Sequence, residues 1–412
     1  MMLEPLLLAG ALMAALLWAI LSAFVLHVDR RRRSGRAIVS TVLSTLRHDD
    51  VRAAPVAGRV ARVAPLLARV SRDMVLFTAA DAGTPREDVD VLAAYLLERW
   101  GEHVLLREAG SHRLPRDVWR RAASLKVLVH LAHPQQFALL ARAADARHAD
   151  VASVALSLLG ASTDPRAIPI LLGALKSHRH PASRVAVHLE HSPLRPAAEL
   201  RALLSDGDPV VRFWAATLLS QYPEIEGLEQ DLAALIDDRD ARVRKAAVQS
   251  LGKIGDTQAG AVAMHLLRDP APFVRAHAAR ALGELEYTQA AAPVAELLGD
   301  ADWWVRAAAK GSLEMMGGEV WPVLMRCLDH PDGFVRNGAA EVFQNLGILD
   351  NLIVMEAASE NPSGAKIDML RRIVAAGGTR LTTSLVERAG GAAAARVREL
   401  LVSVGLQDVG VC

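Results

Sequence analysis

Two cysteines are all that this sequence of 412 residues contains, too few for a disulfide framework. Aromatic residues make up only 4% of the chain. Neither sign of charge dominates, because 47 Lys and Arg residues stand against 46 Asp and Glu residues, which leaves a formal net charge of +1. Such a chain has no basic excess to attract phosphates. We therefore expect a domain in a reducing compartment and no nucleic-acid partner.

The motifs of several enzyme classes are missing as well. The sequence has no Walker A loop, no Gly-x-Gly-x-x-Gly fingerprint, no Gly-x-Ser-x-Gly elbow and no His-Glu-x-x-His pair. Cys327 stands between Leu324 and Leu328 on the apolar side of an expected helix, which is typical of a small core residue rather than a nucleophile. We expect no catalytic residue and no cofactor.

One group of histidines deserves a test as a metal site. His178, His180, His188 and His191 are close in sequence, and His188 and His191 are one helical turn apart. No cysteine or aspartate cluster completes a coordination set, and the surrounding stretch is rich in proline. We favour an irregular, exposed connection over a metal site, although the pattern leaves both open.

A long apolar run stands near the N-terminus. Residues 6–28 are 23 residues without an acidic or basic side chain other than His27. At about 1.5 Å per residue such a helix spans the roughly 30 Å hydrocarbon layer. A cleaved signal peptide would need a basic segment before a shorter apolar core, whereas the only charged side chain before this run is Glu4. We predict a single transmembrane helix at 6–28.

A basic cluster follows the run and predicts its orientation. It consists of Arg30, Arg31, Arg32, Arg33 and Arg36. By the positive-inside rule, residues 1–5 lie outside and the rest of the chain lies in the cytoplasm, at the cytoplasmic (inner) membrane. The same arginines could contact anionic lipid headgroups, although fixing topology is a sufficient role.

Residues 29–115 form a basic, helical juxtamembrane region. Val56 to Val70 is amphipathic, with arginines interspersed. Such helices either lie along the membrane surface or form the first helices of a stack, and the sequence does not decide between the two.

A regular repeat dominates the second half of the chain. Five Val-Arg pairs begin at Val211, Val243, Val274, Val305 and Val335, and subtraction gives spacings of 32, 31, 31 and 30 residues. Alanine follows each valine after four residues, and Leu or Phe follows after eight, so the three positions share one helix face. A fixed period of this length indicates a helical repeat array.

An aspartate stands three residues before the valine in four of the five units, where it would cap the helix. Asp208 and Pro209 illustrate this start, since proline is well tolerated at the first helical position. We predict that the Asp and Arg rows form an ion-pair ladder between neighbouring units. Its members are Asp208, Arg212, Asp240, Arg244, Arg275, Asp302, Arg306, Asp332 and Arg336.

The signature Asp240-Ala241-Arg242-Val243-Arg244, followed by Leu251-Gly252, resembles HEAT repeats, specifically the short bacterial class first named from phycobilisome lyases. The resemblance implies an all-α, right-handed α-solenoid of helix-turn-helix repeats. We assign the repeats to residues 116–350 and capping helices to 351–412. The resemblance to HEAT repeats says little about activity, because such folds carry many functions.

The helix face that varies between units is the best place to expect binding. We predict that a partner protein, itself associated with the membrane, binds there and at Trp303, whereas Trp304 packs in the core. The candidate residues are Phe213, Trp214, Lys245, Gln249, His277, Arg280, Trp303, Asn337 and Glu341. The resulting hypothesis is a membrane-anchored scaffold. The alternatives are a lyase-like or other small-ligand-binding repeat enzyme and a sensor of anionic lipid surfaces.

Overall fold

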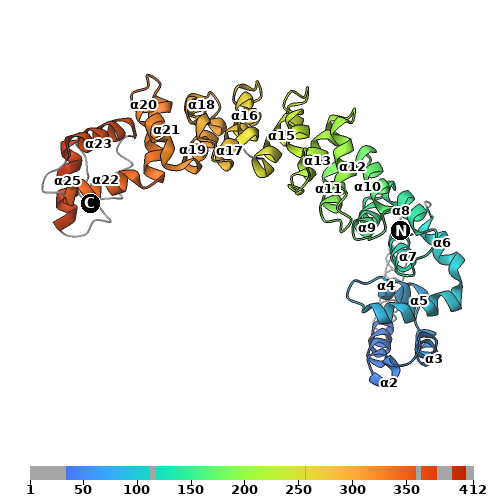
Figure 1. Cartoon of the computed structure of the whole chain (residues 1–412). Coiled ribbons are helices and arrows are strands. Elements are labelled where there is room, and N and C mark those ends of the chain that lie inside the picture. Colours follow the sequence, from blue (N-terminus) through green and yellow to red (C-terminus); the bar gives the residue numbers. More distant parts are fainter. Residues whose placement is uncertain (1–33, 112–116, 256, 359–362, 378–391, 405–412) are drawn as a thin grey trace, which may run out of the picture. The chain divides into compact units, whose positions relative to one another are not determined.

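The computed structural model of this chain describes residues 34–111, 117–255, 257–358, 363–377 and 392–404 (Figure 1). Over these ranges every regular element is a helix and no strand occurs, which confirms the predicted all-α fold for the described part. The helices divide into two compact units, with the division between Arg195 and Pro196. The predicted boundary at residue 115 falls inside the first unit.

None of the described helices is both long and apolar enough to cross a bilayer. The predicted span at 6–28 lies outside the described residues, as do Arg30, Arg31, Arg32 and Arg33. Arg36 is described, and it is exposed on a helical segment that covers residues 34–46.

The first unit is a stack of short helices. After the segment 34–46 come α2 (Asp49–Arg52), α3 (Val56–Leu67), α4 (Arg72–Ala79), α5 (Arg86–Trp100), α6 (Glu102–Ala109), α7 (Val118–His130), α8 (Gln136–Ala144), α9 (Ala149–Gly160), α10 (Ala167–Lys176) and α11 (Ala182–Glu190).

Helix α3 belongs to this stack. Val60, Val63 and Leu67 are at most 2% exposed, and α3 packs against α5. Arg59 of α3 also pairs with Asp88 of α5 at 3.3 Å, and both side chains are buried. Since its apolar face is occupied by the protein, α3 cannot lay that face on a membrane surface.

The second unit contains the repeats. Its elements are α12 (Ala197–Ala202), η2 (Leu203–Ser205), α13 (Pro209–Leu219), α14 (Leu228–Ala233), α15 (Ala241–Ile254), α16 (Thr257–His265), η3 (Leu266–Arg268), α17 (Pro272–Glu284), η4 (Thr288–Ala290), α18 (Ala291–Glu296), η5 (Leu297–Gly299), α19 (Trp303–Met315), η6 (Gly317–Val320), α20 (Trp321–Cys327), α21 (Gly333–Asn345), α22 (Ile348–Ala358), α23 (Gly364–Gly377) and α25 (Ala392–Ser403).

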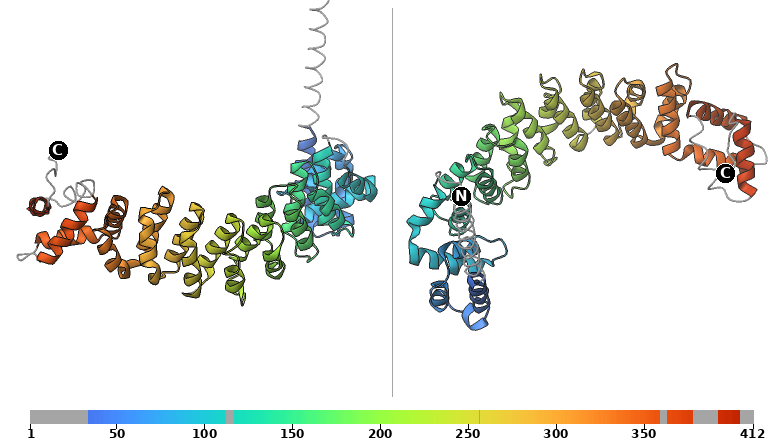
Figure 2. Two further views of the ribbon diagram at one scale, coloured as in Figure 1. Left: turned by 90° about the horizontal axis from the view of Figure 1, so that it is seen from above. Right: turned by 180° about the vertical axis from the view of Figure 1, so that it is seen from behind.

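The repeat helices form two rows. The helices that begin at the Val-Arg signature, α13, α15, α17, α19 and α21, are called second helices below, and each packs on the next. The shorter first helices, α12, α14, α16, α18 and α20, make the other row (Figure 1). Both views in Figure 2 show the repeats of this unit following one another in chain order, as in a solenoid.

Local capping chemistry starts the second helices where the sequence predicts. Asp208, Asp240, Asp302 and Asp332 are the N-caps, and each accepts a hydrogen bond from the backbone N–H two residues on, at 2.8–2.9 Å. Helix α17 begins after Ala271, which offers no side-chain acceptor.

The repeated apolar positions form the core between the rows. Four of the five signature valines and all five of the alanines four residues on are fully buried. Neighbouring second helices approach closely at the Leu-Gly pairs. A Cβ added to Gly283 would lie 2.8 Å from Cα of Ser312, so only glycine fits there. The Ser312 hydroxyl donates to the carbonyl of Ala279 at 2.6 Å, which joins α19 to α17.

The C-terminal helices extend this core. Ile353 of α22, Ile373 of α23 and Leu401 of α25 are fully buried in the same cluster as Phe343 of α21. These three helices lie in or overlap the range 351–412 assigned to capping helices, of which residues 359–362, 378–391 and 405–412 lie outside the described residues.

Candidate protein-binding surface

Eight of the nine residues predicted to bind stand two, three or six residues after a signature valine, and Trp303 stands two before one. These positions, together with the residue just before each valine and Trp303, are called the outward face of the second helices below; Ala246 and Ala276 within this set are buried. On α13, Phe213 and Trp214 are half-buried and contact each other edge to face, with ring centroids 5.1 Å apart. Because the two rings pack on each other, only part of each ring is accessible to a partner.

The outward face of α15 and α17 is basic. Lys245, Gln249, His277 and Arg280 are all half-buried. Burial, followed by the charges of Lys245 and Arg280, lowers the pKa of His277 to about 4. His277 is therefore neutral at pH 7, and the two cations have no acidic partner among the described residues.

A shallow cavity of about 130 Å³ lies beside Arg280. Its lining comes from Arg280 of α17 and from one face of α19: Trp304, Ala307, Ala308, Gly311 and Met315. A Cβ added to Gly311 would meet nothing within 4 Å. The small residues thus leave a hollow between a tryptophan, a methionine and an arginine.

Trp304 is not the core residue that the sequence analysis predicted. It is 43% exposed, because the position before the valine lies in the first turn of the second helix and points outward. Trp303 is 65% exposed, and its ring meets that of Trp304 edge to face with centroids 5.3 Å apart. Phe273 and Phe334, in the column of Trp304, are 40% and 60% exposed.

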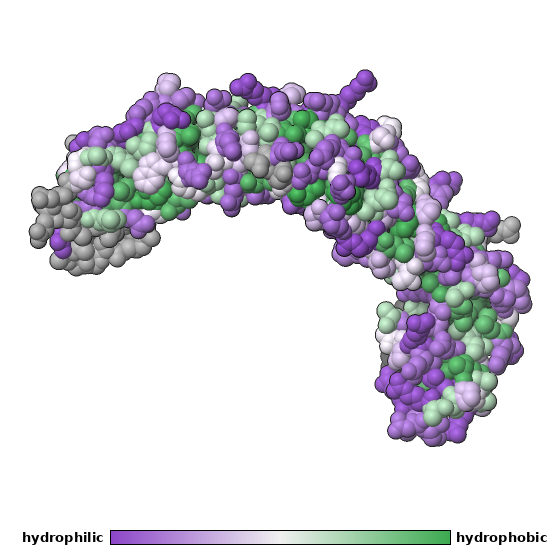
Figure 3. Space-filling model, viewed as in Figure 1, coloured by the Kyte–Doolittle hydropathy of each residue, from purple (hydrophilic) through white to green (hydrophobic). Residues whose placement is uncertain are grey.

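On α21 the predicted binding residues Asn337 and Glu341 are polar and already engaged. Glu341 pairs with Lys310 of α19 and accepts a hydrogen bond from Asn337 at 3.2 Å. Space-filling colouring shows apolar and polar residues interspersed over the visible side of the second unit (Figure 3).

An arginine ladder connects the repeats, but its carboxylates are not those that we predicted. Arg212 pairs with Asp238, Arg244 with Asp269 and Arg275 with Asp300, at 2.7–2.8 Å. The predicted partners, Asp208, Asp240, Asp302 and Asp332, are occupied as N-caps. The partner row lies two residues earlier, where the carboxylates reach the arginine of the preceding unit.

Burial and the arginines act in opposite directions on these carboxylates. The side chain of Asp269 is 3% exposed and that of Arg244 is 13% exposed. Burial alone would raise the pKa of Asp269, but the hydrogen bonds from Arg244 and from the backbone of Ala271 lower it overall. The same balance lowers the pKa of Asp238 and Asp300.

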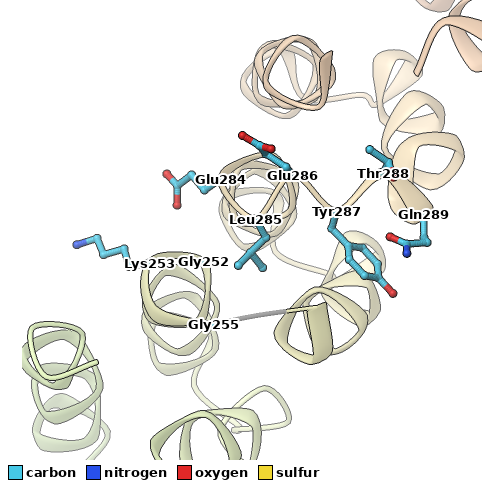
Figure 4. Close-up of a pocket in the computed structure, with 9 residues that line it drawn as sticks. All are labelled: Gly252, Lys253, Gly255, Glu284, Leu285, Glu286, Tyr287, Thr288 and Gln289. Carbon is cyan, nitrogen blue, oxygen red and sulfur yellow. The ribbon is translucent and has the colours of Figure 1, made fainter. Parts of the chain in front are cut away.

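A second, polar cavity of about 530 Å³ lies at the C-terminal ends of α15 and α17, at positions that the sequence analysis did not select. In Figure 4, Lys253 and Glu284 lie on one side of it, while the Tyr287 ring points the other way. The full lining is Gly252, Lys253, Gly255, Glu284, Leu285, Glu286, Tyr287, Thr288 and Gln289. Lys253 and Glu284 occupy one variable column, ten residues after the valine, which an extended alignment of the repeats would have revealed.

The histidine cluster does not form a metal site within the described residues, where no three His, Cys, Asp or Glu side chains are placed to hold an ion. His180 is buried, and His191 Nδ1 lies 2.8 Å from the carbonyl of Val187. Cys327 is partly buried against the repeat core, and burial raises the pKa of its thiol.

Comparison with known proteins assigns the repeats. The sequence model of the HEAT-repeat family matches residues 197–275 and 260–344, so the second unit contains HEAT repeats. No curated protein sequence matches the chain.

Several solved structures are similar to the chain. The complex of CpcE and CpcF of phycocyanin lyase from Nostoc sp. is 20% identical, with a TM-score of 0.31 and coverage of 50% of this chain and 94% of that chain. Human deoxyhypusine hydroxylase is 18% identical, with a TM-score of 0.27 and coverage of 60% and 96%. Kap121p is 13% identical, with a TM-score of 0.44 and coverage of 85% and 46%.

Proposed function

We propose that this chain is a scaffold that binds a partner protein on the outward face of its second helices. Residues 6–28 anchor it to the cytoplasmic membrane as a single transmembrane helix, with the repeats in the cytoplasm. The apolar run at 6–28 and the basic cluster that follows it support the anchor. The chain supplies a binding surface and no chemistry of its own.

The observation that carries the proposal is a row of exposed aromatic rings. Phe273, Trp303, Trp304 and Phe334 stand at the N-terminal ends of three consecutive second helices and are 40–65% exposed. The chain has only 7 Trp and 7 Phe residues, so four on one edge is a marked concentration. Large aromatic side chains are enriched among the residues that dominate binding energy at protein interfaces.

The neighbouring surface suits the same role. The hollow beside Gly311 can receive a side chain, and Arg280, which lines it, provides positive charge. Aromatic anchors in a hollow with a charged rim are the usual anatomy of a protein interface.

Crosslinked affinity purification of the full chain tests the binding surface. A Trp303→Ala, Trp304→Ala variant should lose a partner that the unchanged chain recovers. Trp119→Ala is the matched control, because Trp119 is 63% exposed but lies on α7 of the first unit. Equal recovery by all three proteins would place the binding surface elsewhere, and recovery of no protein by the unchanged chain would remove the scaffold proposal.

Membrane fractionation tests the anchor. The full chain should stay with membranes after an alkaline carbonate wash, whereas a chain lacking residues 1–33 should be released. Release of both proteins would contradict the anchor and leave the binding surface untouched.

A further inference from the structure

The arginine ladder has a constant geometry in three successive rungs. In each, Nη1 of the arginine donates to two backbone carbonyls of the turn just before its own helix, while Nε and Nη2 donate to the two carboxylate oxygens of the aspartate in the next unit. The fork of the guanidinium is therefore filled from within the chain. The aspartate also accepts a backbone N–H two residues on, for example Ala271 N–H to Asp269 at 2.8 Å.

The fourth rung lacks its carboxylate. Nη1 of Arg306 makes the same two contacts, to the carbonyls of Asp300 and Ala301 at 2.8 and 3.1 Å. At the position of the missing aspartate stands His330, whose Nδ1 accepts the backbone N–H of Asp332 at 3.1 Å. The histidine replaces the aspartate in the turn but brings no negative charge to Arg306.

Two groups of the Arg306 guanidinium, Nε and Nη2, consequently have no hydrogen-bond acceptor among the described residues. The nearby Asp300 carboxylate is already bound by Arg275. The guanidinium carbon of Arg306 lies 4.4 Å from the centroid of the Phe334 ring, and this contact and the two Nη1 hydrogen bonds restrict how the guanidinium can turn. A planar guanidinium restricted in this way is suited to bind a carboxylate with two parallel hydrogen bonds.

The surroundings indicate what carries that carboxylate. Phe334 of the neighbouring helix α21 is 60% exposed and lies against the Arg306 guanidinium, and Trp303, 65% exposed, precedes Arg306 by three residues on α19 itself. Arg336, in the next unit, likewise donates Nη1 to two carbonyls and has no carboxylate partner among the described residues. Cations without a carboxylate partner among the described residues, together with the exposed rings of Phe334 and Trp303, are complementary to a segment that alternates acidic and apolar side chains.

We propose that Arg306 binds an Asp or Glu carboxylate of the partner protein in the place that an aspartate of this chain fills in the three preceding units. The acidic residue belongs to a peptide segment whose apolar side chains contact Phe334 and Trp303. This inference rests on the proposed scaffold function and specifies the chemistry of the partner.

The substitution His330→Asp tests the proposal directly, because it supplies the missing carboxylate from within the chain. It should close the fourth rung, maintain or raise the melting temperature, and weaken binding of an acidic segment at least tenfold. Arg306→Gln should weaken binding to a similar degree. Arg268→Gln removes the same charge from an exposed residue of η3 and should change binding less than twofold.

The probe is a phage-displayed library of random peptides, selected on the full chain in detergent. Selected peptides should contain Asp or Glu next to aromatic or aliphatic residues, and synthetic copies should lose affinity when Asn or Gln replaces the acid. Binding should also weaken as salt concentration rises, because the site is partly exposed.

Three outcomes would overturn the inference. Peptides without acidic residues could be selected, His330→Asp could bind the selected peptides as tightly as the unchanged chain, or inorganic polyphosphate could bind in an Arg306-dependent manner while no acidic peptide does. If peptides still depend on Trp303 and Trp304 but ignore His330→Asp, this inference fails and the scaffold proposal stands. If no peptide binds and no partner is recovered by affinity purification, both fail.

Discussion

Removing one rung of the ladder should cost far more stability than removing an ion pair at the surface. The pair to test is Arg244–Asp269, in which two hydrogen bonds of 2.7 and 2.8 Å join side chains that are 13% and 3% exposed. Asp269→Asn retains an oxygen for the Ala271 N–H, so it removes mainly the charge. Arg244→Met retains the apolar stem of the arginine.

The magnitude follows from burial. Breaking a buried ion pair by removing one partner costs about 3–5 kcal/mol, because the remaining charge is left unsolvated. Arg244 reaches some water and keeps its carbonyl acceptors, so we expect about 2–4 kcal/mol for Asp269→Asn and a coupling energy of about 2 kcal/mol in the double-mutant cycle. The control pair, Arg62–Asp50, has side chains 56% and 67% exposed and should show a coupling of at most about 1 kcal/mol.

Urea unfolding and native-state hydrogen exchange are the assays. Repeat arrays can unfold in parts, so exchange of the α15 and α17 amides reports the rung more directly than a global midpoint. The pKa of Asp269 is lowered in the folded state, so the rung contributes fully above the ordinary aspartate pKa, and its contribution is lost as the pH falls through the lowered value. A coupling no larger than that of Arg62–Asp50, or one that persists at pH 2, would refute this reasoning.

Two further predictions concern His277 and Ala271. Because the pKa of His277 is about 4 when folded and near 6.5 when unfolded, only the unfolded chain binds its proton between these values, and stability falls as the pH drops from 6.5 to 4. In His277→Leu this decrease in the free energy of unfolding should be smaller by about 1–2 kcal/mol, a figure that allows for the partial exposure of His277. The measurement is the melting temperature as a function of pH, and parallel curves for the two proteins would contradict the prediction. Ala271→Asp should supply the missing cap of α17 and stabilise the chain by about 0.5–1 kcal/mol in urea unfolding, with destabilisation as the contrary result.

The repeat framework could be predicted from the sequence because its determinants are local or periodic. A cap such as Asp240 acts on a backbone N–H two residues away, and a buried position such as Val243 recurs at a fixed spacing. Both features can be recognised in the sequence without knowing how the units pack. The same alignment also explains Gly283, whose missing side chain admits the neighbouring helix.

The exposure of Trp304 was predicted wrongly because hydrophobicity was taken as burial. Its column in the alignment also contains Arg242, which is exposed, and a charged member of a column argues against a buried position. The repeat period shows which positions of the units are equivalent, but it does not show whether an apolar side chain at one of them is buried. Exposed apolar side chains on a protein surface are typical of sites that bind a partner.

The ladder partners were missed for a different reason. A second acidic column stands five residues before the valine, and its members are Asp206, Asp238, Asp269, Asp300 and then His330. The sequence therefore carried the signal, but choosing between two acidic columns needs the distance across a turn to the preceding unit. Only the folded structure provides that distance.

Departures from the repeat are more informative about function than its regular positions, and the two departures in this array differ in kind. At Ala271 a cap is lost, yet no charge is left unpaired and Pro272 still begins the helix favourably. At His330 the turn is kept intact by the Nδ1 acceptor while the fork of Arg306 loses its carboxylate. The histidine at position 330 therefore preserves the turn but gives the chain no ion pair in the fourth rung. Because the other three rungs all have their aspartate, this exception is where we expect a ligand to bind.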